Sequence, residues 1–222
     1  MSRKIGVLTS GGDAPGMNAA IRAVVRSALS KGMEVYGVHR GYNGLINGDV
    51  FQMDERSVSD IIHQGGTCLY TARCPEFRTQ EGVAKAKAKC DEFGIEGLVV
   101  IGGDGSFRGA ADLSAMGMVC VGIPGTIDND ISCTDYTIGF DTAMNTAMEL
   151  VDKLRDTSQS HDRISVVEVM GRGAGHIAVN TGIACGATDI ITQEVPYNID
   201  AIANTMLEKK AKGKQNFVVI VA

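Results

Sequence analysis

The stretch of residues 98–130, LVVIGGDGSFRGAADLSAMGMVCVGIPGTIDND, is the feature that most constrains the fold. It contains two short apolar segments, 98–101 and 119–123, which a helix-forming segment separates and which both run into glycine-containing turns. Such short apolar segments are typical of buried parallel strands rather than helices. Because consecutive parallel strands joined by a helix end at the same edge of a sheet, the two turns are predicted to lie close together.

The first turn, GGDGS at 102–106, is predicted to bind a polyphosphate together with a metal ion. Its glycines allow close approach of the backbone, and Ser106 is expected to cap a helix over 107–116. The N–H groups at the start of a helix bind phosphate. A carboxylate at such an anion site requires a divalent cation between itself and the phosphate, which makes Asp104 the expected metal ligand.

The second turn, PGTIDND at 124–130, supplies a candidate general base. In phosphoryl transfer the protein mainly positions the reactants, and one carboxylate accepts the proton of the attacking hydroxyl. We expect Asp128 to be that base, and Asp130 to orient it or to share its metal and water contacts. A GGDG turn alone is more often an ordinary strand-to-helix turn, and a DxD pair alone is common in solvated loops, whereas the two at consecutive strand ends are much more specific.

Composition and charge bound the class of protein. The chain has 222 residues, 44% of them apolar, which is enough to form a hydrophobic core. Its net charge of −5 argues against general binding to nucleic acid or anionic membranes. No apolar run approaches 18 residues and no signal-peptide pattern begins the chain, so we expect a soluble, cytoplasmic protein. The six cysteines contain no C-x-x-C pair, which favours reduced thiols.

Alternating strands and helices predict an α/β fold in three layers, with mostly parallel sheets and helices on both faces. We expect two similar domains, 1–140 and an incomplete 141–222, with the active site in the cleft between them. Residues 41–48 are predicted to form a loop. The predicted strands are 4–9, 34–38, 98–101, 119–123, 164–169, 188–192 and 217–222, and the predicted helices are 17–30, 57–64, 81–93, 107–116, 141–157, 173–184 and 199–210.

Four motifs together resemble one known family. They are SGGDAPGMNAAIR at 10–22, GGDGS at 102–106, PGTIDND at 124–130 and MGR at 170–172. In this order they resemble the bacterial-type ATP-dependent 6-phosphofructokinases, and the resemblance runs from Lys4 to Ala222. It implies Mg²⁺-dependent transfer of the γ-phosphoryl group of ATP to the 1-hydroxyl of fructose 6-phosphate, the committed step of glycolysis, in an allosteric homotetramer. Because family members continue further, we also expect this chain to be truncated at its C-terminus.

The resemblance implies a role for each matching position. Nucleotide binding is implied for Gly12, Arg73, Cys74, Gly103, Asp104, Gly105 and Ser106, with Mg²⁺ on Asp104. The transfer step is implied for Asp128, Asp130, Arg73 and Thr126. Binding of the sugar phosphate is implied for Thr126, Ile127, Asp128, Met170, Gly171, Arg172 and, from a neighbouring subunit, Arg163. Binding of allosteric ADP or phosphoenolpyruvate is implied for Arg22, Arg26, Arg155, Lys212 and Lys214, although spacing alone also fits a solvated flank of the helix for the first two.

The sequence departs from the family in two places and leaves some alternatives open. Glu55 stands where members usually have an effector-contacting Arg, and Thr188 stands where many have a metal-binding Glu. Tyr42 either lies against the nucleotide or is structural. Diphosphate-dependent relatives usually have Asp and Lys in place of Gly105 and Gly125, so we predict ATP as the donor. The remaining alternatives are another GGDG-type kinase, acting on NAD or a lipid, and a nucleotide-binding module without activity.

Overall fold

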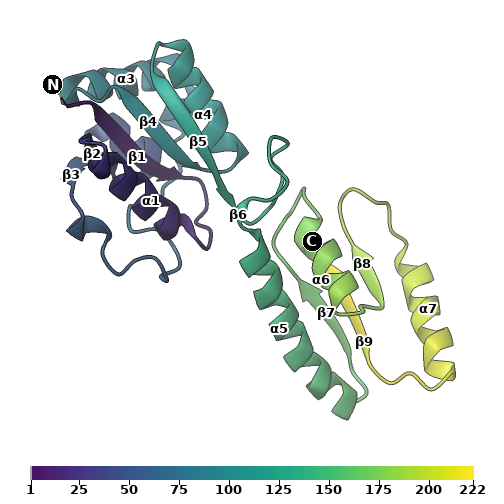
Figure 1. The fold of residues 1–222 in the computed structure, drawn as a ribbon. Coiled ribbons are helices and arrows are strands. Elements are labelled where there is room, and N and C mark those ends of the chain that lie inside the picture. Colours follow the sequence, from purple (N-terminus) through teal and green to yellow (C-terminus); the bar gives the residue numbers. More distant parts are fainter. Residues whose placement is uncertain (1) are drawn as a thin grey trace. The chain divides into compact units, whose positions relative to one another are not determined.

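The computed structural model describes residues 2–222, and the chain divides into two compact units (Figure 1). The first unit contains the residues up to Thr126 together with Ile131–Gly139. The second contains Ile127–Asp130 and Phe140–Ala222. Each unit has its own sheet, so the predicted α/β class with mostly parallel strands is confirmed.

The sheet of the first unit has the strand order β3-β2-β1-β4-β5-β6, and only β2 and β3 pair in antiparallel fashion among the pairs described. Its strands are β1 (Lys4–Ser10), β2 (Glu34–Val38), β3 (Val50–Met53), β4 (Gly97–Gly102), β5 (Val119–Thr126) and β6 (Ile138–Gly139). Its helices are α1 (Met17–Ser30), α2 (Gly41–Asn47), α3 (Gln80–Phe93) and α4 (Asp104–Ala115), with 3-10 turns at Arg56–Val58 and Glu76–Arg78.

Helices cover both faces of this sheet. On one face, α2, α3 and α4 bury a cluster that includes Leu45, Ala86 and Leu113 against Leu98 and Val100 of β4. On the other face, α1 packs on β1, β2 and β4 through an apolar stripe that includes Ile21 and Val25. Burial of these side chains stabilises the unit by about 1.5–3 kcal/mol each, and it fixes where the turns at the carboxyl ends of β1, β4 and β5 lie.

The second unit has a three-stranded parallel sheet in the order β7-β9-β8. Its elements are α5 (Phe140–Ser160), β7 (Ile164–Glu168), α6 (His176–Ala184), β8 (Asp189–Ile191), α7 (Ile199–Ala211) and β9 (Phe217–Val221). The central strand β9 alternates: Val218 and Ile220 pack with residues of α5 and α6, whereas Phe217 and Val219 pack with Met206 of α7. The unit is therefore also layered, with helices on both faces of its sheet.

Residues 41–48 form helix α2 and not the predicted loop. The sequence GYNGLIN is poor in helix formers, but Tyr42, Leu45 and Ile46 are buried, and tertiary packing outweighs propensity. A Cβ at Gly44 would lie 1.7 Å from the carbonyl oxygen of His39, so the glycine is needed for close approach of the chain.

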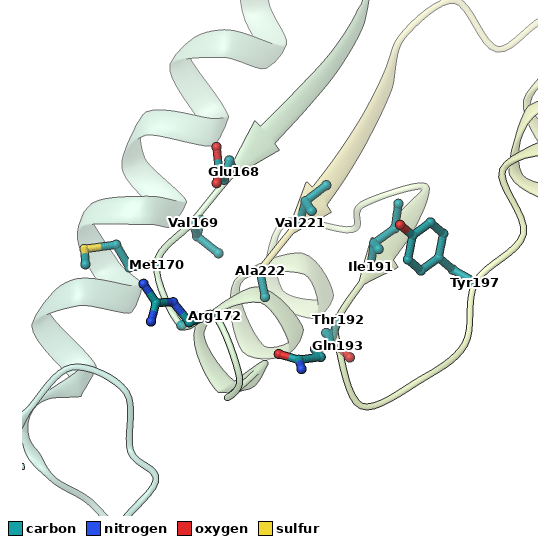
Figure 2. A pocket seen from close by; sticks show the side chains of 11 residues that line it. Glu168, Val169, Met170, Arg172, Ile191, Thr192, Gln193, Tyr197, Val221 and Ala222 are labelled. Atoms are coloured by element: carbon teal, nitrogen blue, oxygen red, sulfur yellow. The ribbon is translucent and has the colours of Figure 1, made fainter. Parts of the chain in front are cut away.

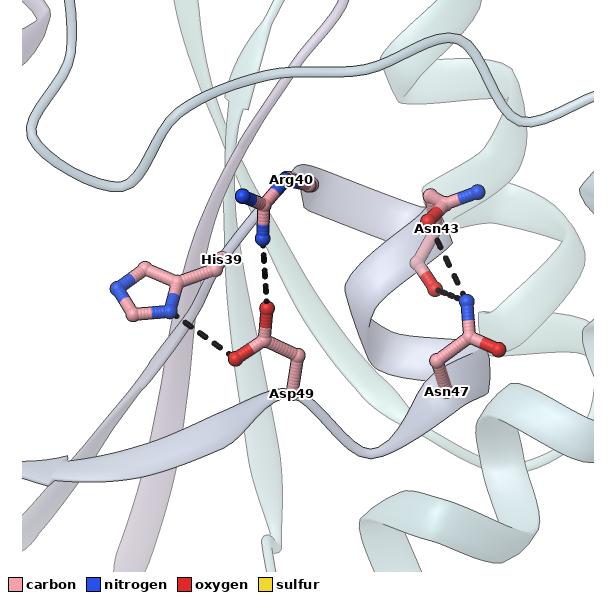
Figure 3. Close-up of polar contacts among 5 residues, drawn as sticks. All are labelled: His39, Arg40, Asn43, Asn47 and Asp49. Carbon is pink, nitrogen blue, oxygen red and sulfur yellow. Dashed lines mark hydrogen bonds and ion pairs between the residues drawn. The ribbon is translucent and has the colours of Figure 1, made fainter.

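The return from α2 to β3 is held by one carboxylate. Asp49 accepts a hydrogen bond from Nδ1 of His39 and forms an ion pair with Nη1 of Arg40, both at 3.0 Å (Figure 3). These half-exposed contacts contribute modestly to stability, about 0.2–1 kcal/mol each. Together with the helix they turn the chain back so that β3 pairs with β2.

Residues 57–64 do not form the predicted helix. Only Arg56–Val58 make a 3-10 turn, which begins where Asp54 accepts the N–H of Ser57 at 2.8 Å. Asp60 has a φ of 56°, in the left-handed region that a right-handed helix excludes. The segment therefore leads as an irregular chain into residues 64–74.

Candidate active site

The GGDGS turn closes the carboxyl end of β4 and begins α4 at Asp104. Ser106 is inside the first turn of this helix, so the prediction that it caps a helix starting at 107 is wrong. Its buried hydroxyl instead donates to the carbonyl oxygen of Ser10, at 2.9 Å. A Cβ at Gly102 would lie 2.5 Å from that same carbonyl, so glycine is required there. The turn is thereby fixed to the end of β1.

Tyr42 of α2 holds the same turn in place. Its side chain is 5% exposed and stacks on Phe77 with ring centroids 3.9 Å apart. Its hydroxyl donates to the carbonyl oxygen of Ser106 at 2.6 Å, and burial raises its pKa far above the ordinary value of 10.0. Of the two alternatives left open by the sequence, these contacts favour the structural one. They rest on a long-range contact between α2 and α4 that no local pattern encodes.

The GGDG and PGT segments lie side by side in the first unit. Gly102 pairs with Pro124 in the ladder between β4 and β5. A Cβ placed on Gly103 would lie 3.6 Å from the Cβ of Thr126, so Gly103 and the Thr126 side chain are neighbours. Residues 124–126 continue β5, which makes this strand longer than the predicted 119–123. The structure thus brings Gly103, Asp104 and Thr126 to one edge of the sheet.

Residues 64–71 are anchored to the ends of β1 and α1 by two side chains that sequence reasoning missed. The hydroxyl of Thr9 donates to the carbonyl oxygen of Tyr70 at 2.9 Å. The Asn18 amide donates to the carbonyl of Gln64 and accepts the N–H of Cys68 at 2.7 Å. Both residues are polar yet almost fully buried, and a polar residue in an apolar strand or stripe is the signal that could have revealed them.

Arg73 and Cys74 follow directly on this anchored segment. The hydroxyl of Thr71 donates to the carbonyl oxygen of Gly11, next to Gly12. The Arg73 side chain is exposed, whereas Cys74 packs against the core cluster of the unit. The structure therefore brings the segment before Arg73 to the SGGD turn.

Asp104 provides the one sequence-predicted metal ligand of this edge. Its carboxylate forms an ion pair with Arg108, Oδ2 to Nη2 2.8 Å, so it already faces a cation. No group of three or more His, Cys, Asp or Glu side chains able to hold a metal ion occurs within residues 2–222. A single carboxylate at a turn that is predicted to bind phosphate nevertheless fits Mg²⁺, because this ion is commonly held by one or two carboxylates, substrate phosphates and water.

The IDND segment, Ile127–Asp130, belongs to the second unit. Asn129 has a φ of 51°, a conformation that Asn tolerates better than most residues. It separates the half-buried Asp128 from the exposed Asp130. Burial, and secondarily the negative charge of Asp130, raise the pKa of Asp128 above its ordinary value of 3.8. A carboxylate with a raised pKa is a better proton acceptor.

A cavity of about 680 Å³ opens at the carboxyl ends of β7, β8 and β9 (Figure 2). Met170, Gly171 and Arg172 of the predicted MGR motif line it. So do Gln193 and Tyr197 from the segment after β8, which sequence reasoning missed. Within this cavity the charged lining residues are Arg172 and Glu168. An arginine in a cavity at strand ends suits an anionic ligand.

The structure does not bring Arg163 to this cavity. It immediately precedes β7, at the amino end of the strand, whereas the cavity lies at the carboxyl end.

Of the predicted effector residues, Arg22 and Arg26 are on α1 in the first unit. The other three are in the second unit: Arg155 on α5 donates to the carbonyl oxygen of Cys185, and Lys212 and Lys214 flank the turn before β9.

The structure contains six free cysteines, of which Cys90 and Cys185 are buried. None of the helices in residues 2–222 is long and apolar enough to span a membrane.

Comparison with known proteins shows the family. The sequence matches the phosphofructokinase family over residues 4–222. An ATP-dependent 6-phosphofructokinase of Clostridium botulinum is 62% identical over 220 residues, which are 99% of this chain and 69% of the relative. The corresponding protein of Clostridium tetani is 61% identical with the same coverage. A solved phosphofructokinase structure from Saccharomyces cerevisiae matches with a TM-score of 0.89 and 40% identity, over 100% of this chain and 34% of that one. This chain belongs to the phosphofructokinase family.

Proposed function

We propose that the chain transfers the γ-phosphoryl group of ATP to the 1-hydroxyl of fructose 6-phosphate, as an ATP-dependent 6-phosphofructokinase. The proposal rests on one observation: the GGDGS turn is hydrogen-bonded to Ser10 and lies against Thr126 at one edge of the sheet. The clostridial relatives, with 61–62% identity, bear this name and support it. The products are fructose 1,6-bisphosphate and ADP.

In this proposal the first unit binds the nucleotide. The backbone of Gly12, Gly103, Gly105 and Ser106 contacts the phosphates, and Arg73 and Cys74 complete the site. Asp104 would hold Mg²⁺, and the ion would supply charge neutralisation for the transferred group. A Cβ on Gly105 would meet no atom within 4 Å, so the space beside this residue is free for a phosphate.

Asp128 is the proposed base for the 1-hydroxyl. Its raised pKa supports this role, because a base is most effective when its pKa approaches the working pH. Asp130 orients Asp128, and Arg73 and Thr126 stabilise the transferred phosphoryl group. Thr126 and Ile127 also contact the sugar.

The sugar phosphate is proposed to occupy the cavity lined by Met170, Gly171 and Arg172. Arg172 supplies positive charge for the dianionic ligand. Arg163 of a second subunit is proposed to complete the phosphate site, which requires an oligomer, and by family resemblance a homotetramer. Regulation by ADP or phosphoenolpyruvate would use Arg22, Arg26, Arg155, Lys212 and Lys214. The cytoplasm is the proposed location.

Replacement of the base tests the proposal. Asp128→Ser should lower kcat by about 10²–10⁴-fold while leaving the KM for fructose 6-phosphate similar, because only proton transfer is lost. Asp112→Ser, which removes an exposed carboxylate of α4, should leave kcat unchanged. Product formation is measured with ATP and with diphosphate as donors. Near-normal turnover by Asp128→Ser would remove this residue from the mechanism, and turnover with diphosphate alone would overturn the choice of donor.

A further inference from the structure

The loop that carries Arg172 into the cavity has an unusual backbone. Gly171 has a φ of 144° and Arg172 a φ of 48°. The N–H of Ala174 donates to the carbonyl oxygen of Gly171 at 2.9 Å, and a Cβ on Gly171 would lie 2.3 Å from the carbonyl oxygen of Ala174. A non-glycine residue in the left-handed region is costly and persists only when its surroundings hold it. Something outside the loop must therefore fix residues 170–175.

That support comes from the segment after β8. The N–H of Gly175, at the start of α6, donates to Oε1 of Glu194 at 2.7 Å. A Cβ on Gly175 would lie 2.6 Å from Cγ2 of the buried Thr192, so the two segments are in direct contact. α6 has no side-chain cap of its own. A charge-assisted hydrogen bond at the N-terminus of a helix is a strong one.

The charge of Glu194 is part of this contact. Its pKa lies below the ordinary value of 4.5, first because the Gly175 N–H donates to it, with a smaller contribution from the charge of His176. The carboxylate thus remains charged at neutral pH. Because it occupies the N-terminus of α6, an incoming phosphate is not drawn there, and Arg172 remains the positive side chain lining the cavity.

We propose that Glu194 is a positioning residue for the sugar phosphate: through the Gly175 N–H it holds residues 170–175 in the conformation that presents Arg172 to the cavity. Figure 2 shows Arg172 on the loop after β7 and Gln193, the neighbour of Glu194, on the segment after β8. The identity of the ligand rests on the proposed function. The restraint of residues 170–175 by Glu194 does not depend on that function.

The test uses the full chain with three substitutions. Glu194→Gln keeps an acceptor oxygen but loses the charge, Glu194→Ala loses both, and Glu208→Gln removes an exposed carboxylate of α7 in the same unit as a matched control. Circular dichroism checks that each variant is folded. Calorimetry measures the Kd for fructose 6-phosphate and for ATP, and NMR follows the amides of Gly171, Arg172 and Gly175.

We expect the Kd for fructose 6-phosphate to rise about tenfold or more in Glu194→Ala and less in Glu194→Gln, because a hydrogen bond to a charged group is lost in the first and weakened in the second. The Kd for ATP and all values for Glu208→Gln should not change. In the unsubstituted chain the Gly175 amide should shift as Glu194 titrates, with a midpoint below the ordinary glutamate value of 4.5. Both substitutions at 194 should abolish this titration.

An unchanged Kd for fructose 6-phosphate in Glu194→Ala would overturn the proposal. A Gly175 amide without the acidic titration would do so as well. If the unsubstituted chain bound no fructose 6-phosphate, the proposed function would fail instead, and the amide shifts of Gly171 and Arg172 would still decide the positioning role: they move in Glu194→Ala if it is correct and stay if it is wrong.

Discussion

Tyr42 and Ser106 are 64 residues apart in the chain, and the phenolic hydroxyl of the first donates to the backbone carbonyl of the second at 2.6 Å. This bond joins α2 to the first turn of α4. Because Ser106 also donates to Ser10, residues of β1, α2 and α4 meet at the GGDGS turn. The turn is therefore held by its surroundings and is not a free surface loop.

Removing the phenolic hydroxyl should weaken this support. Tyr42→Phe keeps the stacking on Phe77 but leaves the buried bond to Ser106 unmade, so we expect a loss of about 0.5–1.5 kcal/mol in the free energy of unfolding and weaker binding of ATP. Urea denaturation and calorimetry measure the two effects. Tyr36→Phe, which removes a 3.3 Å hydrogen bond to Glu34, is the control. Equal stabilities of the two variants would contradict the role of Tyr42.

Two glycines of the turn should respond in opposite ways to alanine. Gly102→Ala places a Cβ 2.5 Å from both the Ser10 carbonyl and the Ser106 hydroxyl, so it should destabilise the chain by about 1–3 kcal/mol. Gly105→Ala meets nothing within 4 Å and lies in a helix, so it should stabilise by up to about 1 kcal/mol while weakening ATP binding. Thermal unfolding with and without ATP separates the effects. Similar stability changes in both variants would refute the packing argument.

The acidic limb of the pH–rate profile should depend on Asp130. Burial and the charge of Asp130 raise the pKa of Asp128, and a base works only when deprotonated, so kcat rises as the pH passes upward through that raised pKa. Asp130→Asn removes the like charge, lowers the pKa of Asp128 and moves the limb to lower pH. Carboxyl NMR of Asp128 provides a readout independent of turnover. Asp112→Asn should shift neither profile, and an unmoved Asp128 titration in Asp130→Asn would contradict the coupling.

Asn129 should tolerate glycine but not valine. Its φ of 51° suits Gly, so Asn129→Gly should change the free energy of unfolding by less than about 1 kcal/mol. Asn129→Val forces a β-branched residue into the left-handed region, at a cost of about 1–3 kcal/mol, and displaces Asp128. Urea denaturation and kcat are measured for both. A valine variant as stable and active as the glycine variant would show that this backbone conformation is not required.

Local patterns determined much of the fold. The apolar segments around β4 and β5 and the helices over 17–30 and 199–210 were predicted correctly, because burial and capping, as by Asn198 at the start of α7, depend on neighbouring residues. The errors lie where distant contacts decide. The α2 segment is helical because the core buries Tyr42 and Leu45, and the helix predicted over 57–64 does not form because Asp60 has a positive φ.

The chemistry-bearing motifs were visible in the sequence itself, since the kinds of residue and their order at strand ends identify the family. The sequence did not reveal the residues that hold these motifs in place: Thr9 and Asn18 under residues 64–71, Tyr42 under the GGDGS turn, and Glu194 beside residues 170–175. Each acts through a hydrogen bond to backbone many residues away. Such bonds have no periodicity or spacing along the chain, so only the tertiary structure decides them.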